Sequence, residues 1–170
     1  GTLEIMGPLP PHEDYKKRIG RMVEATTEEL EIEVRSLGST TWQRQDLQKG
    51  LEPDQCYYIE NERLVRGKAD IDLTQDPPPD LAIEVDNTRS SLDRMAIYAA
   101  LGVPEVWRFD GESLTIYRLV GDKYASQERS AVLPLLLRVD ILRFLQASQT
   151  MGETSWVREF RQWVRGKLQG

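Results

Sequence analysis

The longest amphipathic pattern in the chain runs from about Glu13 to Leu30, directly after a proline-rich entry. Core-type side chains return there every three or four positions, which is the spacing of one face of an α-helix. This face consists of Tyr15, Ile19, Met22, Val23, Thr26 and Leu30. Lysine, arginine and glutamate occupy the other face. The pattern therefore predicts a helix with one side on a core and the other in solvent.

Five shorter segments have the composition or the alternation of β-strands. They are Ile32–Leu37, Asp54–Glu60, Asp80–Val85, Val106–Phe109 and Leu114–Leu119. The third follows three successive prolines and is a continuous apolar run around one carboxylate, as in a central strand that is buried on both faces. Asp110-Gly111 stands between the last two segments and predicts a hairpin turn.

Helical spacing returns in three later segments, which are Ser91–Leu101, Val139–Leu145 and Ser155–Leu168. Thr88, Ser90 and Ser91 are candidate N-caps for the first of these helices, and Gly102 ends it. The chain shows no internal repeat and no clear linker.

Two polar segments complete the pattern. We expect a loop over Trp42–Gly50, and a charged connection over Asn61–Gln75 that is partly disordered or carries a short strand. The order of helices and strands predicts an α/β or α+β fold. The length of 170 residues suits a single domain, residues 1–170.

Composition limits the classes of function. Hydrophobic residues make up 39% and charged residues 29%, an ordinary balance for a soluble globular protein. Since no apolar run approaches the ~20 residues of a membrane span and no signal peptide is recognisable, we expect a cytoplasmic protein without membrane contact. The single cysteine, Cys56, excludes an internal disulfide and a cysteine-based zinc cluster. With only one histidine as well, chemistry must come from carboxylates.

The net charge of −6 and the pI near 5.0 argue against a protein that coats nucleic acid through bulk positive charge. They are compatible with an enzyme that grips a few phosphates through a local basic face and neutralises an acidic centre with metal. The charge therefore excludes one kind of nucleic-acid binding and leaves another open.

Glu84 is the first candidate for chemistry, because a carboxylate in an apolar strand is costly to bury alone. Asp86 follows two residues later and so points to the same face of the strand. Two carboxylates on one face would bind a hard divalent cation such as Mg²⁺ or Mn²⁺. Equally, Glu84 could pair with an arginine while Asp86 starts a turn, and the spacing does not decide between the two.

Asp54 and Asp80 each follow a proline at the start of a predicted strand. At such a position a carboxylate can face a cleft without losing its solvent. An aspartate after proline is also a very common turn or strand-start residue, so the pattern alone favours that ordinary role for both.

Taken together, these segments resemble a known family. The resemblance rests on four motifs in order: Pro53-Asp54, Pro79-Asp80-Leu-Ala-Ile-Glu84-Val85, Arg94-Met-Ala-Ile-Tyr98 and Gly102-Val-Pro-Glu-Val-Trp107. The family is a large bacterial one, assigned as restriction endonucleases and long catalogued as a domain of unknown function, in the PD-(D/E)XK superfamily. The resemblance covers roughly His12 to Phe109, with a looser fit beyond, and is most specific from Asp80 to Trp107.

The resemblance implies a restriction-endonuclease-like fold, with a mixed sheet flanked by helices and a divalent metal, Mg²⁺ or Mn²⁺, at the open end of the central strands. Asp54 and Glu84 would match the acidic motif residues that hold the metal. The first helix of such proteins often brings another polar group to the site, for which His12 and Glu13 are candidates here. A solvent-exposed helix entry is the alternative for His12.

One position departs from the superfamily pattern, because Asp86 stands where its lysine is expected. Asp86 would then be a further metal ligand. Arg94 and Tyr98 are four residues apart, so they share a helix face, similar to the Gln/Lys-x-x-x-Tyr arrangement of some relatives. Arg94 would contact the scissile phosphate, although its high pKa makes it a poor activator of water. The alternative is an ion pair of Arg94 with Asp86 or Glu84 in a protein that has lost catalysis.

Basic residues give weaker support for DNA binding. They occur at Lys16, Lys17, Arg18, Arg21, Arg63, Arg66, Lys68, Arg158, Arg161, Arg165 and Lys167, with Trp156 and Trp163 among the last four. Interleaved aromatic and basic residues suit nucleic acid, but at helical spacing the tryptophans fit a core or a dimer contact better. We regard the charges as solvated faces.

Three functions remain open. The first is a Mg²⁺- or Mn²⁺-dependent DNA endonuclease, which would act as a homodimer because cutting both strands needs two sites. The second is a catalytically inactive DNA- or protein-binding module with the same fold. The third is a metal-dependent phosphoesterase that acts on another substrate. The missing lysine and the acidic pI favour the second, and Glu84 within an apolar strand favours the first.

Overall fold

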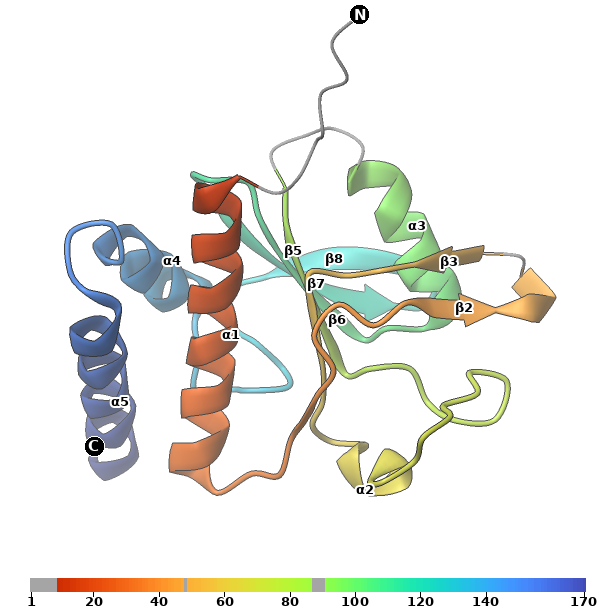
Figure 1. Cartoon of the computed structure of the whole chain (residues 1–170), viewed down its shortest axis with the longest axis horizontal. Coiled ribbons are helices and arrows are strands. Elements are labelled where there is room, and N and C mark those ends of the chain that lie inside the picture. The colour runs from red at the N-terminus through yellow and green to blue at the C-terminus, as the bar shows by residue number, and fades with distance from the viewer. Residues whose placement is uncertain (1–8, 48, 87–90) are drawn as a thin grey trace, which may run out of the picture.

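A six-stranded mixed sheet forms the centre of the protein in a computed structural model that describes residues 9–47, 49–86 and 91–170 (Figure 1). Its strands, in spatial order, are β1 (Arg35–Ser36), β4 (Gln55–Tyr58), β5 (Leu81–Val85), β6 (Glu105–Phe109), β7 (Leu114–Val120) and β8 (Lys123–Gln127). A separate hairpin consists of β2 (Trp42–Arg44) and β3 (Lys49–Leu51), joined through the 3-10 turn η1 (Gln45–Leu47). The helices are α1 (Pro10–Leu30), α2 (Glu62–Val65), α3 (Ser91–Leu101), α4 (Arg138–Ala147) and α5 (Glu153–Gln169).

The directions of the strands decide which strand ends meet. β5 and β6 run parallel, and the other neighbouring strands of the sheet pair antiparallel. A parallel pair needs a crossover, which α3 provides. All five residues of β5 are buried, as expected of a central strand that is covered on both faces.

Helices cover the two faces of the sheet unequally (Figure 1). The helices α1, α4 and α5 lie on one face, and α3 lies on the other together with the β2–β3 hairpin. Two apolar clusters follow from this arrangement. The larger one joins Ile83 and Val85 of β5 to side chains of α1, α4 and α5, and the smaller one joins Ala82 to the α3 side. Alternate residues of β5 thus supply both cores.

Gly20 of α1 lies against the ends of two side chains of β4. A Cβ atom at this position would lie 2.9 Å from the hydroxyl of Tyr57 and 3.2 Å from the side-chain Nε2 of Gln55. The Tyr57 ring is fully buried, and its hydroxyl donates a 2.9 Å hydrogen bond to Glu24 of α1. The absence of a side chain at Gly20 therefore leaves room for the Tyr57 hydroxyl and its hydrogen bond to Glu24.

We expect Gly20→Ala to lower the free energy of unfolding by about 1–3 kcal/mol, because the added methyl group overlaps the buried Tyr57 hydroxyl and displaces it from Glu24. An alanine normally stabilises a helix interior relative to glycine by about 1 kcal/mol. Gly166→Ala in α5 is the matched control, since nothing lies near its Cβ position, and it should stabilise. Urea unfolding measures both variants, and equal stabilisation by both would contradict the close approach.

Most predicted elements are confirmed, including the helix Ser91–Leu101 at both ends. The first helix is confirmed with an earlier start, and the last two helices and the strands around Asp110-Gly111 are confirmed with small shifts of their ends. The strand predicted over Ile32–Leu37 is reduced to two residues. Candidate N-caps Thr88 and Ser90 lie outside the described residues.

Two predictions about the remaining segments were wrong. The loop expected over Trp42–Gly50 is the β2–β3 hairpin, whose ends Trp42 and Leu51 pack into the smaller core. The pattern concealed it because, among the hairpin residues whose burial is described, Trp42 and Leu51 alone are buried, and most residues between them are polar. The connection Asn61–Gln75 carries the short helix α2 rather than a strand. Within the described parts of the chain, no helix is long and apolar enough to cross a membrane.

Candidate active site

The candidate site lies at one edge of the sheet, that is, along the row of strand ends where β5 ends and β4 begins. Because β4 and β5 are antiparallel, the start of one strand meets the end of the other. Their register, continued by one residue, places Asp54 opposite Glu84, and the Asp54 amide donates a 3.1 Å hydrogen bond to the Ile83 carbonyl. The N-terminal ends of α1 and α3 reach the same edge (Figure 1). Two carboxylates from separate segments are thereby brought to one place.

A cavity of about 620 Å³ opens at this edge. It is lined by Leu9, Pro11, His12, Tyr15, Glu52, Asp54, Glu84, Val85, Asp86, Arg94, Asp110 and Gly111. Five of these residues are carboxylic acids, whereas arginine and histidine contribute one each. The cavity therefore attracts cations, and a polyanion can enter only when some of the negative charge is neutralised.

Glu84 is the most enclosed acid of the site, with a side chain only 6% exposed. It points to the α3 side of β5, because its neighbours Ile83 and Val85 belong to the opposite core. Its Oε1 atom accepts hydrogen bonds from the Arg94 Nε at 3.1 Å, the Arg94 Nη2 at 2.7 Å and the Tyr98 hydroxyl. Three donors therefore converge on a single carboxylate oxygen.

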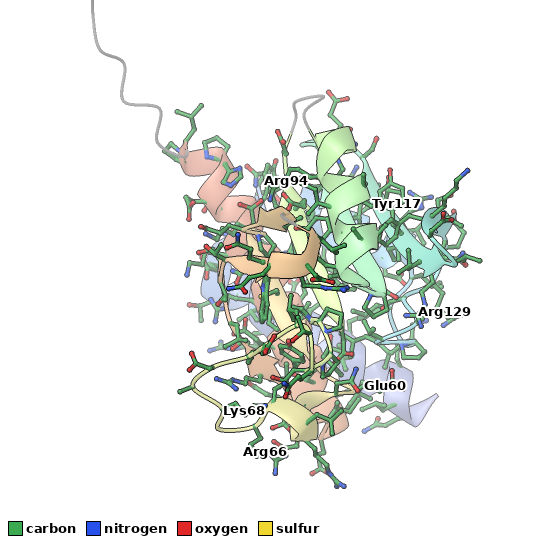
Figure 2. The ribbon with its side chains drawn as sticks, turned by 90° about the vertical axis from the view of Figure 1, so that its right-hand side faces the viewer. Glu60, Arg66, Lys68, Arg94, Tyr117 and Arg129 are labelled. Carbon is green, nitrogen blue, oxygen red and sulfur yellow. The ribbon has the colours of Figure 1, made fainter. Side chains whose placement is uncertain are left out.

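The helix α3 supplies both partners of Glu84. Arg94 and Tyr98 lie one helical turn apart, so both side chains reach the same carboxylate, as their spacing predicted. Arg94 is near the N-terminal end of α3, at the edge of the molecule where α1 also begins (Figure 2). Its Nη2 atom also donates a 2.7 Å hydrogen bond to the Glu52 carbonyl. The arginine thus links α3 to the segment that enters β4.

Burial and charge shift the ionisation of these groups. Burial raises the pKa of Glu84, and the nearby Asp54 raises it further, while hydrogen bonds from Arg94 and Tyr98 oppose the shift. Burial also raises the pKa of the Tyr98 hydroxyl, reinforced by the charge of Glu84. Burial acts to lower the pKa of Arg94, but the contacts with Glu84 outweigh it and the pKa is raised. Tyr98 and Arg94 are therefore hydrogen-bond donors at neutral pH and not proton acceptors.

Asp54 is held from two sides. Its Oδ1 atom lies 3.1 Å from the His12 Nε2, and its Oδ2 atom accepts a 2.7 Å hydrogen bond from the Val85 amide. His12 belongs to the first turn of α1, and Val85 is the last residue of β5. The carboxylate of Asp54 is thus fixed between the helix and the strand end, while its side chain remains about one-fifth exposed to the cavity.

The structure brings most of the predicted site residues together, but it does not bring Glu13 there. Of the two candidates on the first helix, His12 lines the cavity and contacts Asp54. Glu13 points elsewhere, with its nearest cation Lys16 at 3.9 Å. The two residues are adjacent on a helix and so point about 100° apart, which the sequence pattern could not resolve. Asp86 lines the cavity, and its amide extends the sheet to the Phe109 carbonyl at 3.0 Å.

Several features of the site were missed in the sequence. Glu52 contributes its carbonyl oxygen to Arg94, a role that no side-chain motif could signal. Tyr15 lines the cavity and packs edge-on against Phe109, although its helical spacing indicated only a core position. Asp110 and Gly111 also reach the cavity, because β6 is parallel to β5 and ends at the same edge.

Asp80 has a structural role at the other end of β5. It is buried, and its Oδ2 atom accepts hydrogen bonds from the Ile59 amide at 2.6 Å and the Asn61 amide at 2.9 Å. The Asn61 side chain donates a third, at 2.8 Å to Oδ1. These contacts satisfy the carboxylate within the protein, which confirms the ordinary strand-start interpretation for this residue.

The interleaved aromatic and basic residues of α5 make contacts within the chain. Trp156 is fully buried, and the guanidinium of Arg18 stacks over its ring at 4.9 Å. Arg161 and Arg165 form ion pairs with Glu28 and Glu29 of α1. The core interpretation of the tryptophan is confirmed, and these arginines join α1 to α5.

The oxygen donors at the cavity suit a hard divalent cation. Among the described residues no group of three or more His, Cys, Asp or Glu side chains is arranged to hold a metal ion. Mg²⁺ is usually bound through one or two carboxylates, while water and substrate phosphate complete its coordination. Asp54 and Glu84 fit such a site, provided that substrate supplies part of the coordination.

Comparisons with known proteins agree with this geometry. A family model named Uma2 and described as "putative restriction endonuclease" matches residues 1–148. The chain belongs to the Uma2 family. No curated protein sequence matches it.

A solved structure extends the Uma2 assignment to the fold. The crystal structure of a "putative nuclease belonging to DUF820" from Anabaena variabilis superposes with a TM-score of 0.58. The alignment covers 84% of this chain and 86% of that chain, at 15% sequence identity. At this identity the likeness shows the fold, so the predicted restriction-endonuclease-like architecture is confirmed for this Uma2 member. Nucleases of this type typically use divalent metals.

Proposed function

We propose that this Uma2 protein is a Mg²⁺- or Mn²⁺-dependent DNA endonuclease, with residues 1–170 acting as one domain. The observation that carries the proposal is the meeting of Asp54 and Glu84 at the start of β4 and the end of β5, in one acidic cavity. The description of the Uma2 family as restriction endonucleases supports it, as does the shared fold with a protein described as a nuclease.

Asp54 and Glu84 would hold the cation, with Asp86 beside them on the cavity wall. When bound, a divalent cation lowers the pKa of a coordinated water and neutralises charge that develops on the phosphate. The Val85 amide and His12 orient Asp54 from two sides. Tyr98 is buried and donates to Glu84, so it orients the second carboxylate. The motif residues are thus fixed before substrate arrives.

Arg94 supplies the positive charge for the substrate in this proposal. A guanidinium stays protonated and binds a phosphate through two parallel hydrogen bonds. Arg94 lines the cavity and is about one-third exposed, so it can reach a phosphate that enters there. Cleavage of both strands of a duplex requires two such sites, and we therefore propose a homodimer as the working form.

A catalytically inactive DNA- or protein-binding module is the second candidate. One observation favours it, because the Arg94–Glu84 ion pair neutralises the central acid without a metal. The absence of the superfamily lysine points the same way, since Asp86 stands in its place. An inactive module would keep the fold and the Arg94–Glu84 pair and would neither bind Mn²⁺ nor cut DNA.

Titration calorimetry with Mn²⁺ and a plasmid-nicking assay on the same proteins separate the two candidates. We expect Asp54→Ala and Glu84→Ala each to abolish Mn²⁺ binding and to slow nicking by at least about 100-fold. Asp122→Ala is the matched control, because this exposed aspartate lies in the β7–β8 turn at the opposite edge of the sheet. Absence of Mn²⁺ binding and of nicking in the wild type would instead establish the inactive module.

A further inference from the structure

The Arg94–Glu84 contact has an unusual geometry for an arginine–carboxylate pair. Two guanidinium nitrogens, Nε and Nη2, donate to the same oxygen, Oε1, rather than to one oxygen each. The Tyr98 hydroxyl donates to this oxygen as well. Each carboxylate oxygen offers about two lone-pair sites. Three donors therefore saturate Oε1, and this oxygen can ligate a cation only after Arg94 has left.

We propose that Arg94 takes the place of the divalent cation on Glu84 and exchanges this carboxylate for a DNA phosphate when metal and substrate bind together. The inference rests on the proposed function and adds to it a coupling between the two ligands. The ion pair is then a resting state of the active protein and not a mark of lost catalysis.

The surroundings of the pair favour movement of the arginine and not of the glutamate. The Glu84 side chain is 6% exposed on a central strand, whereas the Arg94 side chain is 31% exposed on the cavity wall. The second anchor of Arg94 is the Glu52 carbonyl, a neutral acceptor in a non-strand segment. The guanidinium can therefore turn into the cavity without being buried further.

Tyr98 keeps Glu84 in position during the exchange. Its side chain is almost completely buried in the smaller core, so its hydroxyl cannot follow Arg94. Once Arg94 leaves, Oε1 retains one donor and gains a free lone-pair site for the cation. The buried tyrosine is thus a positioning residue and the exposed arginine is the mobile one.

The exchange has a thermodynamic consequence. Without DNA, a cation that ligates Oε1 must displace Arg94 and break its ion pair with Glu84, which weakens metal binding. With DNA, the phosphate receives Arg94 and frees Glu84, so each ligand strengthens the binding of the other by the same factor. Such couplings typically amount to about 5–150-fold in affinity.

Titration calorimetry on the full chain tests the exchange, with Mn²⁺ as the metal and a short duplex of phosphorothioate DNA, which resists cleavage. The variants are Arg94→Met, which keeps the aliphatic stem, and Arg63→Met, a matched control that removes an exposed arginine of α2. We expect Arg94→Met to bind Mn²⁺ at least about fivefold more tightly than the wild type when DNA is absent. The duplex should tighten Mn²⁺ binding less in Arg94→Met than in the wild type and Arg63→Met.

The outcomes are distinguishable. If Arg94→Met binds Mn²⁺ no more tightly than the wild type without DNA, or if the duplex tightens both equally, the exchange is refuted while the metal site stands. If none of the proteins binds Mn²⁺ with or without the duplex, the proposed function fails and the exchange with it. Should Arg94→Met not fold, fluorescence anisotropy of the duplex on the wild type decides, because absence of any Mn²⁺ effect on DNA affinity would overturn the coupling.

Discussion

Replacing Glu84 with alanine is expected to lower the free energy of unfolding by roughly 2 kcal/mol, even though the change removes a buried charge next to Asp54. If repulsion between the carboxylates dominated, the substitution would stabilise the protein. The contacts indicate the reverse. Glu84 accepts hydrogen bonds from Arg94 and from the buried Tyr98 hydroxyl, and the latter cannot turn to solvent. A donor left without an acceptor in the core outweighs the relief of repulsion.

Glu84→Gln separates charge from hydrogen bonding in the same experiment. Glutamine keeps a carbonyl oxygen for Tyr98 and Arg94 but removes the charge that burial disfavours. We expect its stability to lie within about 1 kcal/mol of the wild type. Chemical unfolding of Glu84→Ala, Glu84→Gln and Glu84→Ala/Tyr98→Phe checks this account, because the double variant should recover part of the loss. Stabilisation by Glu84→Ala would show that repulsion dominates.

Three carboxylates in this chain share one local pattern, and only the fold distinguishes them. Asp54, Asp80 and Glu105 each follow a proline at the entry to a strand, Glu105 as its first residue and the two aspartates one residue before it. β5 and β6 are parallel, so Asp80 and Glu105 lie together at one edge of the sheet, where Leu81 pairs with Glu105. β4 runs the other way and places Asp54 at the opposite edge, beside the end of β5. Strand direction is a property of long-range pairing, so the local sequence could not separate the candidate ligand from the two structural acids.

The rest of the fold was predictable in proportion to the regularity of its hydrophobic pattern. The helix at Ser91–Leu101 has both helical spacing and a glycine stop, and its ends were predicted to the residue. By contrast, β8 was not predicted, because it is an edge strand with mostly exposed residues and no apolar alternation. The family resemblance selected Asp54 and Glu84. Only the structure shows that Arg94 reaches the Glu52 carbonyl. Only the structure shows that His12, and not its neighbour Glu13, points toward Asp54.

Glu105 is the acid at the opposite edge whose removal should destabilise the protein most. It is completely buried. Its Oε2 atom accepts hydrogen bonds from the Trp107 indole at 2.8 Å and the Ser130 hydroxyl at 2.6 Å, and its Oε1 atom accepts one from the Ala131 amide at 2.8 Å. The carboxylate thereby fastens the segment after β8 to the central sheet. Glu105→Ala leaves these donors unsatisfied, and we expect a loss of about 3–5 kcal/mol in the free energy of unfolding.

Glu128→Ala is the matched control for this loss, because it removes an exposed glutamate that pairs with Arg138 at 3.2 Å. A surface ion pair contributes at most about 1 kcal/mol, so this variant should unfold close to the wild type. Guanidinium denaturation followed by tryptophan fluorescence measures both, since Trp107 donates directly to Glu105. Equal, small losses for the two variants would contradict an anchoring role. A large loss of stability is expected in Glu105→Ala alone, and this variant should still bind Mn²⁺ at temperatures where it stays folded. That result would show that the acids at one edge of the sheet stabilise the fold and those at the other edge bind the metal.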